Sequence, residues 1–158
     1  VATIGRAFGM KVISAALPGW QSTTHSQTPR LALPAFLATA DVVSIHCPLS
    51  EQTRNLIAAG ELAQMKTSAL LINCARGGIV NEQALADAVT QGTIAGAGVD
   101  VLSQEPPIDG NILLQLDIPN LIVTPHCAWG SQQARQRLVK QAGDKLRAFL
   151  NSVYRKTR

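Results

Sequence analysis

Polar residues that could bind and protonate a small carboxylic acid follow three apolar runs of the sequence. They are Arg76 with the two glycines after it, Asp100 and Glu105, and His126. A guanidinium offers a planar fork of donors that matches a carboxylate with two hydrogen bonds. A His side chain can exchange a proton near neutral pH, and a neighbouring carboxylate supports its charged form. These residue types could therefore bind the carboxylate of a small acid and transfer a proton to or from that molecule.

Each of these residues also has an ordinary structural interpretation. An Arg at the end of a strand is commonly a surface charge, and an isolated His before a loop is commonly a structural residue. However, parallel strands end at one edge of a sheet, where open α/β sheets bind their ligands. We therefore expect Arg76, Glu105 and His126 to share a site. Gly77 and Gly78 beside the Arg would allow a ligand to approach the backbone.

The elements that must position these residues are short apolar runs that alternate with helical patterns. Strands are predicted over residues 11–16, 42–47, 69–73, 97–102 and 121–124. Their apolar residues are continuous rather than alternating, which is typical of parallel strands buried on both faces. Helices are predicted over residues 34–40, 58–65, 82–90 and 112–116. The alternation predicts a doubly wound parallel α/β sheet. The stretch 18–29, between the strand over 11–16 and the helix over 34–40, is predicted to be a surface loop.

The boundaries of two helices carry recognisable signals. Asn81 is a suitable N-cap for the helix over 82–90, and Gly92 is a suitable stop. Residues 1–8 have the spacing of an amphipathic helix that ends at Gly9. In nucleotide-binding α/β domains, such a helix follows a first strand and a glycine-rich turn that holds the pyrophosphate.

That glycine-rich turn has no counterpart in the sequence. A single Gly-x-Gly occurs, at Gly96 and Gly98, and Val101 interrupts the longer pattern. These two glycines lie on a predicted strand and are expected to allow close packing of the backbone. We therefore expect a Rossmann-like domain without its first strand and its glycine-rich loop.

Composition excludes several classes of protein. The 158 residues are 46% hydrophobic and 15% charged, which excludes an intrinsically disordered chain. No apolar run is long enough to cross a bilayer, so no membrane contact is expected. The three cysteines are widely spaced, which excludes a disulfide framework and a Cys-x-x-Cys metal site. The sequence thus predicts reduced thiols and a cytoplasmic location.

Positive charge is concentrated at the C-terminus. The formal net charge is +4, and eight of the 14 basic residues lie in the last 24 positions beside one acid, Asp144. We interpret this as a solvated helix face over 129–152 followed by a basic tail over 153–158. The alternative is a nucleic-acid contact, but the aromatic residues that would stack on bases are not interleaved with the charges. No nucleic-acid partner is expected.

Four segments together closely resemble the nucleotide-binding domain of the D-specific 2-hydroxyacid dehydrogenases. They are VSIHCPL (43–49), LLINCARGGIV (70–80), GVDVLSQEP (98–106) and VTPHCAW (123–129). The resemblance extends from Val1 to about Leu150 and is greatest to the glycerate, or hydroxypyruvate reductase, branch. It implies hydride transfer between NAD or NADP and C2 of a small D-2-hydroxy or 2-oxo acid. It also implies a homodimer formed through this domain.

The resemblance assigns a role to individual residues. Arg76 would hold the substrate carboxylate, His126 would protonate the 2-oxo oxygen, and Glu105 would orient His126. The cofactor pocket would be lined by Cys47, Cys74, Ala75, Arg76, Asp100, His126 and Ala128. Asp100 would face the nicotinamide end of the cofactor. No metal ion is implied.

Two departures from the family pattern affect these expectations. Ala16 occupies the place of an acidic residue that normally holds the ribose hydroxyls, so both NAD and NADP remain open. We also expect no counterpart of the family's N-terminal substrate-binding domain within residues 1–158. We therefore expect residues 1–158 to form one incomplete nucleotide-binding domain, with an α/β core over 1–128, that is inactive alone. The alternative is a non-enzymatic remnant or an interaction module.

Overall fold

The computed structural model describes residues 1–17, 30–115, 117–118 and 120–156, so the loop predicted over 18–29 lies outside the described residues. The chain divides into two compact units, Val1–Pro125 and His126–Arg158. The first unit contains the sheet and all the short helices. Among its described residues, the second contains one long helix.

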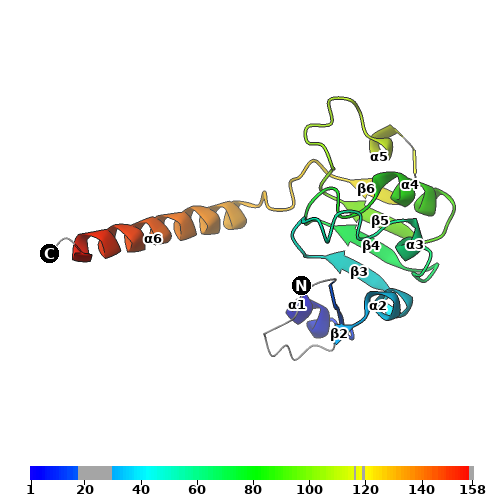
Figure 1. Cartoon of the computed structure of the whole chain (residues 1–158), viewed down its shortest axis with the longest axis horizontal. Coiled ribbons are helices and arrows are strands. Elements are labelled where there is room, and N and C mark those ends of the chain that lie inside the picture. Colours follow the sequence, from blue (N-terminus) through cyan, green and yellow to red (C-terminus); the bar gives the residue numbers. More distant parts are fainter. Residues whose placement is uncertain (18–29, 116, 119, 157–158) are drawn as a thin grey trace. The chain divides into compact units, whose positions relative to one another are not determined.

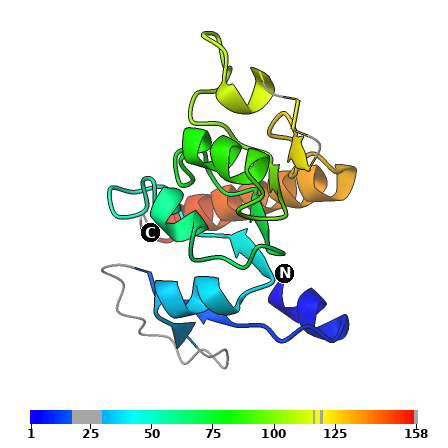
Figure 2. The same cartoon turned by 90° about the vertical axis from the view of Figure 1, so that its right-hand side faces the viewer.

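The first unit is a parallel α/β structure. Its elements, in chain order, are α1 (Ala2–Ala7), β1 (Ser14–Ala15), β2 (Arg30–Leu31), α2 (Leu33–Thr39), β3 (Val42–Ile45), α3 (Ala59–Leu62), β4 (Leu70–Asn73), α4 (Glu82–Thr90), β5 (Gly96–Val99), α5 (Ile112–Gln115) and β6 (Leu121–Val123). Strands β3, β4, β5 and β6 pair in that order, and every pair is parallel (Figure 1). Strands β1 and β2 form a separate parallel pair, which lies with α2 beside the β3 end of the larger sheet (Figure 2). The predicted Rossmann-like class is confirmed.

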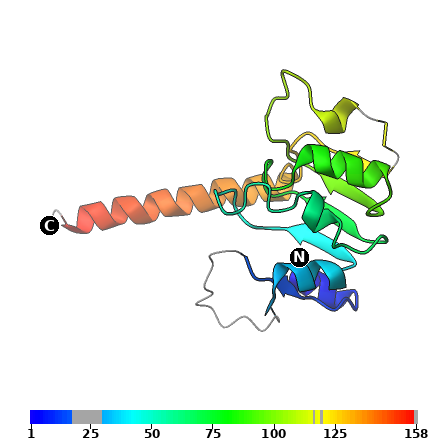
Figure 3. The same ribbon diagram turned by 45° about the vertical axis from the view of Figure 1, so that its right-hand side comes forward.

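The core lies between one face of the four-stranded sheet and the helices α2 to α5. Val43, Leu71 and Val99 project from the strands into this core, and each is buried. Leu62 of α3 and Leu85 of α4 are fully enclosed in the same cluster. Figure 3 shows α3 and α4 on the same side of the sheet. Burial of these apolar side chains is the main force that holds the unit together.

The opposite face of the same strands is only partly covered. The side chains that alternate with the core residues include Val42, Leu70 and Ile122, which are 47%, 42% and 67% exposed. The expectation of strands buried on both faces is therefore wrong for these three residues. A continuous apolar run reveals side-chain type, but it cannot show whether another element covers that face.

Several local signals are confirmed, although the element boundaries differ. The Asn81 side chain accepts a hydrogen bond from the Ala84 backbone N–H at 2.9 Å, and α4 spans the predicted residues. At Gly96 a Cβ atom would lie 2.6 Å from the Asn120 carbonyl oxygen, which confirms the prediction of close packing there. The predicted helix over 58–65 is shorter, because α3 has four residues. Strand β2 was not predicted, since two residues are too few to show a pattern.

The second unit consists of a short segment and α6 (Gln132–Lys156). The Ser131 hydroxyl accepts from the Ala134 N–H at 3.2 Å, which satisfies one free donor at the start of the helix. Asp144 forms ion pairs with Lys140 and Arg147 along the surface of α6. The helix continues into the segment predicted as a basic tail, of which residues 157–158 lie outside the described part. Within the described residues, no helix is both long and apolar enough to span a membrane.

Candidate functional site

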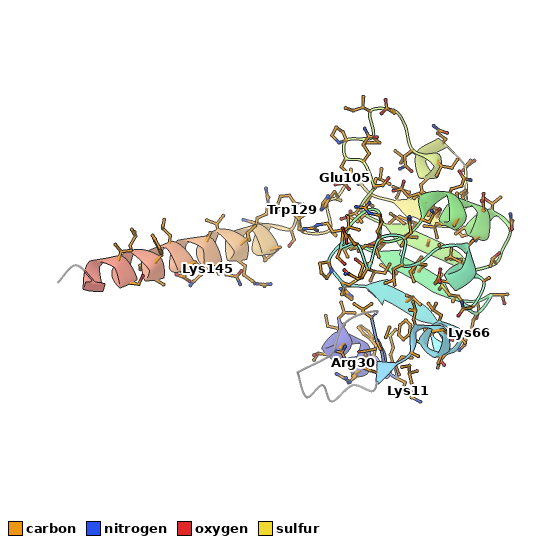
Figure 4. All side chains as sticks on the ribbon, viewed as in Figure 1. Lys11, Arg30, Lys66, Glu105, Trp129 and Lys145 are labelled. Carbon is orange, nitrogen blue, oxygen red and sulfur yellow. The ribbon has the colours of Figure 1, made fainter. Side chains whose placement is uncertain are left out.

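Most of the predicted site residues lie at the carboxyl edge of the four-stranded sheet. Cys47 follows β3, the segment 74–76 follows β4, and Asp100 and Glu105 follow β5. Because these strands are parallel and hydrogen-bonded in register, their ends meet at one edge. Figure 4 shows Glu105 on the loop after β5, with Lys66 at the opposite edge of the sheet. The fold therefore gathers residues that are far apart in the sequence.

The loop that carries Arg76 is shaped by a buried amide. The Asn73 side chain is 2% exposed at the end of β4. Its Nδ2 donates to the Arg76 carbonyl oxygen at 3.0 Å, and its Oδ1 accepts from the Ala75 N–H at 3.1 Å. The exposed Arg76 side chain donates from Nη1 to the Ala75 carbonyl oxygen at 2.6 Å. Asn73 thus satisfies two backbone groups of the turn and fixes the direction in which Arg76 leaves the sheet.

Gly77 presses the Arg76 loop against the loop that follows β5. A Cβ atom on Gly77 would lie 1.9 Å from the Leu102 carbonyl oxygen and 2.5 Å from the Ser103 nitrogen. Glycine is required there because backbone of the same chain fills the space. The expectation that Gly77 leaves room for a ligand is therefore wrong.

The loop that carries Glu105 is held from two directions. The Leu102 N–H donates to Glu105 Oε1 at 2.8 Å, so the carboxylate folds back on its own loop. Glu82, in the first turn of α4, accepts from both the N–H and the hydroxyl of Ser103, at 2.6 and 2.8 Å. The Asn111 side chain donates to the same Glu82 carboxylate at 2.8 Å. Glu82 therefore binds both ends of this loop.

Asp100 is a buried carboxylate at the end of β5. It is 3% exposed and accepts a hydrogen bond from the Thr124 hydroxyl at the end of β6. Its backbone N–H donates to the Asn73 carbonyl oxygen at 2.9 Å. Burial raises the pKa of the Cys74 thiol, and the negative charge of Asp100 raises it further. Burial also raises the pKa of Cys47.

His126 and Ala128 belong to the second unit. The backbone of His126 has φ of 50°, an uncommon value for a residue with a side chain. Its carbonyl oxygen accepts from the Trp129 indole N–H at 2.9 Å. The roles predicted for His126 and Ala128 rest on the sequence motif and remain predictions. Strained backbone of this kind is often found at functional sites, and here it occurs at the predicted acid/base residue.

The sequence assigned no role to two residues that shape the site. Asn73 ends an apolar run of the sequence, and a polar residue in that position can indicate a structured loop. Glu82 stood in the first turn of a predicted helix, where a carboxylate is favoured in any case. Within the described part of the chain, no group of three or more His, Cys, Asp or Glu residues could hold a metal ion.

Known proteins share both the sequence and the fold. The family described as D-isomer specific 2-hydroxyacid dehydrogenase, NAD binding domain, matches residues 1–128. Glycerate dehydrogenase from Methylorubrum extorquens is 47% identical over 150 residues, which cover 95% of this chain and 46% of that protein. Hydroxypyruvate reductase from Blautia hydrogenotrophica is 35% identical over 147 residues, which cover 93% and 45%.

A solved structure agrees with these matches. The NAD-complexed D-isomer specific 2-hydroxyacid dehydrogenase from Lactobacillus delbrueckii ssp. bulgaricus superimposes with a TM-score of 0.78 at 33% identity, over 96% of this chain and 49% of that one. The chain therefore spans about half the length of the curated relatives it matches.

Proposed function

This chain belongs to the D-isomer specific 2-hydroxyacid dehydrogenases by its NAD-binding domain, and we propose that it serves hydride transfer at C2 of a small D-2-hydroxy or 2-oxo acid. Glycerate and hydroxypyruvate are the favoured pair, since relatives with those names match over almost the whole chain. The observation that carries the proposal is the meeting of Arg76, Asp100 and Glu105 at the carboxyl edge of one parallel sheet. Ligands of open α/β sheets bind at this edge.

The residues at this edge fit a nicotinamide cofactor. A bound nicotinamide supplies or accepts the hydride. Asp100, a buried carboxylate at the strand end, would accept a hydrogen bond from the carboxamide end of the ring. Cys47 and Ala75 are small, partly buried residues beside the core, and they would line the pocket of the ring. Ala16 directly follows β1 and offers no carboxylate to exclude a 2′-phosphate, so NADP is proposed as an alternative to NAD.

Substrate binding is proposed for Arg76. Its side chain is exposed at the edge of the sheet, and its loop is held by Asn73 and by the contact of Gly77 with Leu102. A guanidinium in a fixed direction can bind the substrate carboxylate with two parallel hydrogen bonds. That contact would set the position of C2.

Proton transfer is proposed for His126 with Glu105 as its partner. His126 would donate a proton to the 2-oxo oxygen during reduction and accept it during oxidation. Glu105 would orient the imidazole ring and stabilise its charged form. Support comes from the Thr124-Pro125-His126 motif and from the left-handed backbone at His126.

The test is a chimera that joins this chain to the part of the Methylorubrum extorquens glycerate dehydrogenase preceding the matched region. Reduction of hydroxypyruvate would be followed by the absorbance of NADH and, separately, NADPH. We expect His126→Ala to lower kcat by about 10²- to 10⁴-fold, the range typical of general acid catalysis. Arg76→Lys should mainly raise KM for the 2-oxo acid, because the forked contact is lost.

The matched control is Lys66→Ala at the opposite edge of the sheet, which should leave both kinetic constants unchanged. Undiminished kcat in the His126→Ala chimera would contradict the assignment of the acid. Comparable kcat/KM values for NADH and NADPH would support the proposal that Ala16 removes the discrimination between them.

We also propose a homodimer in the cytoplasm. The exposed apolar residues Val42, Leu70 and Ile122 on the open sheet face support an association between chains. The same residues favour the alternative, a non-enzymatic interaction module. Light scattering after size exclusion would test the assembly, and a monomer at high concentration would contradict the dimer. Turnover by the chimera would contradict the alternative.

A further inference from the structure

We propose that Glu82 is a positioning residue that holds the loop between β5 and α5 and thereby places the carboxylate of Glu105. The inference rests on the proposed function of Glu105, and it assigns a functional role to a residue outside the predicted site. Glu82 itself would touch neither substrate nor cofactor. It would act through Ser103 and Leu102.

The Glu82 carboxylate accepts three hydrogen bonds from the loop. Glu82 is half-buried in the first turn of α4, and both of its carboxylate oxygens accept hydrogen bonds. Oε1 accepts from the Ser103 N–H at 2.6 Å, and Oε2 accepts from the Ser103 hydroxyl and from Asn111 Nδ2, both at 2.8 Å. Hydrogen bonds to an ionised acceptor are about twice as strong as those between neutral groups.

These contacts close the loop at both of its ends. Ser103 lies near the start of the loop and Asn111 at its end, and Glu105 stands between them. Asn111 is 9% exposed, and its Oδ1 accepts from the Leu113 N–H at 3.0 Å, so that end is also tied to α5. The Glu82 carboxylate therefore holds the loop near both of its ends.

The path from Glu82 to Glu105 is short. Glu82 fixes the Ser103 N–H, and the neighbouring Leu102 N–H donates to Glu105 Oε1 at 2.8 Å. The Leu102 carbonyl oxygen also packs against Gly77, beside Arg76. Displacement of Ser103 would therefore move the Leu102 N–H and with it the Glu105 carboxylate.

The competing explanation is that Glu82 only stabilises α4, as acidic residues in a first turn do. The chain offers a matched control for this in the preceding residue. Asn81 caps α4 by accepting from the Ala84 N–H at 2.9 Å, and none of its side-chain hydrogen bonds in the described structure reaches the loop. Asn81→Ala should therefore weaken the helix without releasing the loop.

The first experiment measures amide hydrogen exchange in the full chain. Glu82→Ala should speed exchange of the Leu102 amide by about tenfold or more, because an anchored loop then opens locally. Leu102 is informative since its hydrogen bond is to Glu105 and not to Glu82. Glu82→Gln keeps the size of the side chain but turns an amide NH₂ toward the donors of the loop, and it should have a smaller effect. An unchanged Leu102 amide, or an equal effect of Asn81→Ala, would overturn the inference.

The second experiment measures steady-state kinetics in the chimera. Glu82→Gln should lower kcat by about tenfold while KM for cofactor and 2-oxo acid stays within about twofold, because orientation and not binding is affected. In a Glu105→Gln background the same change should have no further effect on kcat. Asn81→Ala should leave kcat unchanged.

The outcomes separate the inference from the function on which it rests. If Glu105→Gln lowers kcat but Glu82→Gln does not, the positioning role is wrong and the proposed function stands. If Glu82→Gln has its full effect in the Glu105→Gln background, the positioning role is also wrong. If Glu105→Gln leaves kcat unchanged, the proposed role of Glu105 is wrong and the inference falls with it. If the chimera is inactive, the proposed function loses support, and the Leu102 exchange rate decides whether Glu82 anchors the loop.

Discussion

The two edges of the four-stranded sheet are built differently. At the amino edge, the connection to β4 is a tight turn with one ion pair between Lys66 and Asp41 at 2.8 Å, whose side chains are 40% and 79% exposed. At the carboxyl edge, Asn73 and Asp100 are 2% and 3% exposed, and side chains tie the loops together. Burial of polar groups is costly unless each is hydrogen-bonded. At the carboxyl edge buried polar groups hold the loops in one geometry, whereas the turn before β4 at the amino edge is joined by exposed side chains.

The largest expected effect comes from Gly77→Ala at the carboxyl edge. A Cβ atom would overlap the backbone of Leu102, which is not a flexible side-chain end. We expect the free energy of unfolding to fall by about 3 kcal/mol or more, measured by urea denaturation. The control is Gly60→Ala in α3, where a Cβ would meet nothing within 4 Å and should change stability by no more than about 1 kcal/mol. Equal effects of the two changes would remove the contrast between tight loops and open helix surface.

Asn73→Ala should have the next largest effect. It removes a buried amide and leaves the Ala75 N–H and the Arg76 carbonyl without this partner. The expected loss is about 1 to 3 kcal/mol of unfolding free energy, the cost of unsatisfied groups. Asn120→Ala before β6 is the matched change, since its exposed side chain donates to the Ala95 carbonyl and to no other group in the described part of the chain. A loss at Asn120 as large as the loss at Asn73 would contradict the distinction between the two edges.

The charge of the buried Asp100 carboxylate should affect the alkylation rate of the Cys74 thiol. Burial and the Asp100 carboxylate raise the pKa of this thiol, so less thiolate is present at pH 8 than in a free cysteine. Asp100→Asn removes the charge contribution, which lowers the pKa and increases the alkylation rate at pH 8. The rate should rise without reaching that of a free cysteine, because the contribution of burial to the pKa remains.

The pH dependence provides the control for this measurement. At a pH above the Cys74 pKa of both the unchanged chain and Asp100→Asn, Cys74 is ionised in both proteins. Their Cys74 alkylation rates should therefore converge. The Cys47 thiol, whose pKa is raised by burial, should be unaffected by Asp100→Asn. An increase that persisted at high pH would indicate a change in access and not in charge.

The smallest effect is expected at the amino edge. Lys66→Ala breaks an exposed ion pair with Asp41, and such pairs contribute about 0 to 1 kcal/mol. Unfolding free energy should therefore change little, and any change should shrink at high salt because screening weakens exposed charges. A loss comparable to that of Asn73→Ala would show that the amino edge also depends on specific polar contacts.

Much of the architecture could be predicted without coordinates. Parallel strands follow from the alternation of apolar runs with helical patterns, and the ends of α4 follow from Asn81 and Gly92. These features depend on short stretches of chain, where backbone preference and side-chain type act locally. Strand β2 and the exposed side chains of Val42 and Ile122 could not be predicted, because they depend on neighbours from distant segments.

The candidate site divides in the same way. Arg76, Asp100 and Glu105 could be selected by residue type and by their place after apolar runs, since parallel strands must end at one edge. The reason for Gly77 could not be found in this way, because a glycine beside an Arg has the same local signature whether ligand or backbone fills the space. Only the packing of Leu102 against it decides between the two.

Residue types and their order thus determine the class of fold and the chemistry available at the carboxyl edge, because both follow from local periodicity and the rules of parallel sheets. Tertiary structure alone decided that one carboxylate, Glu82, holds the loop of Glu105. Its partners Ser103 and Asn111 lie 21 and 29 positions away in the chain. Contacts over such separations are formed by the packing of α4 against α5, and they cannot be predicted from a local sequence pattern.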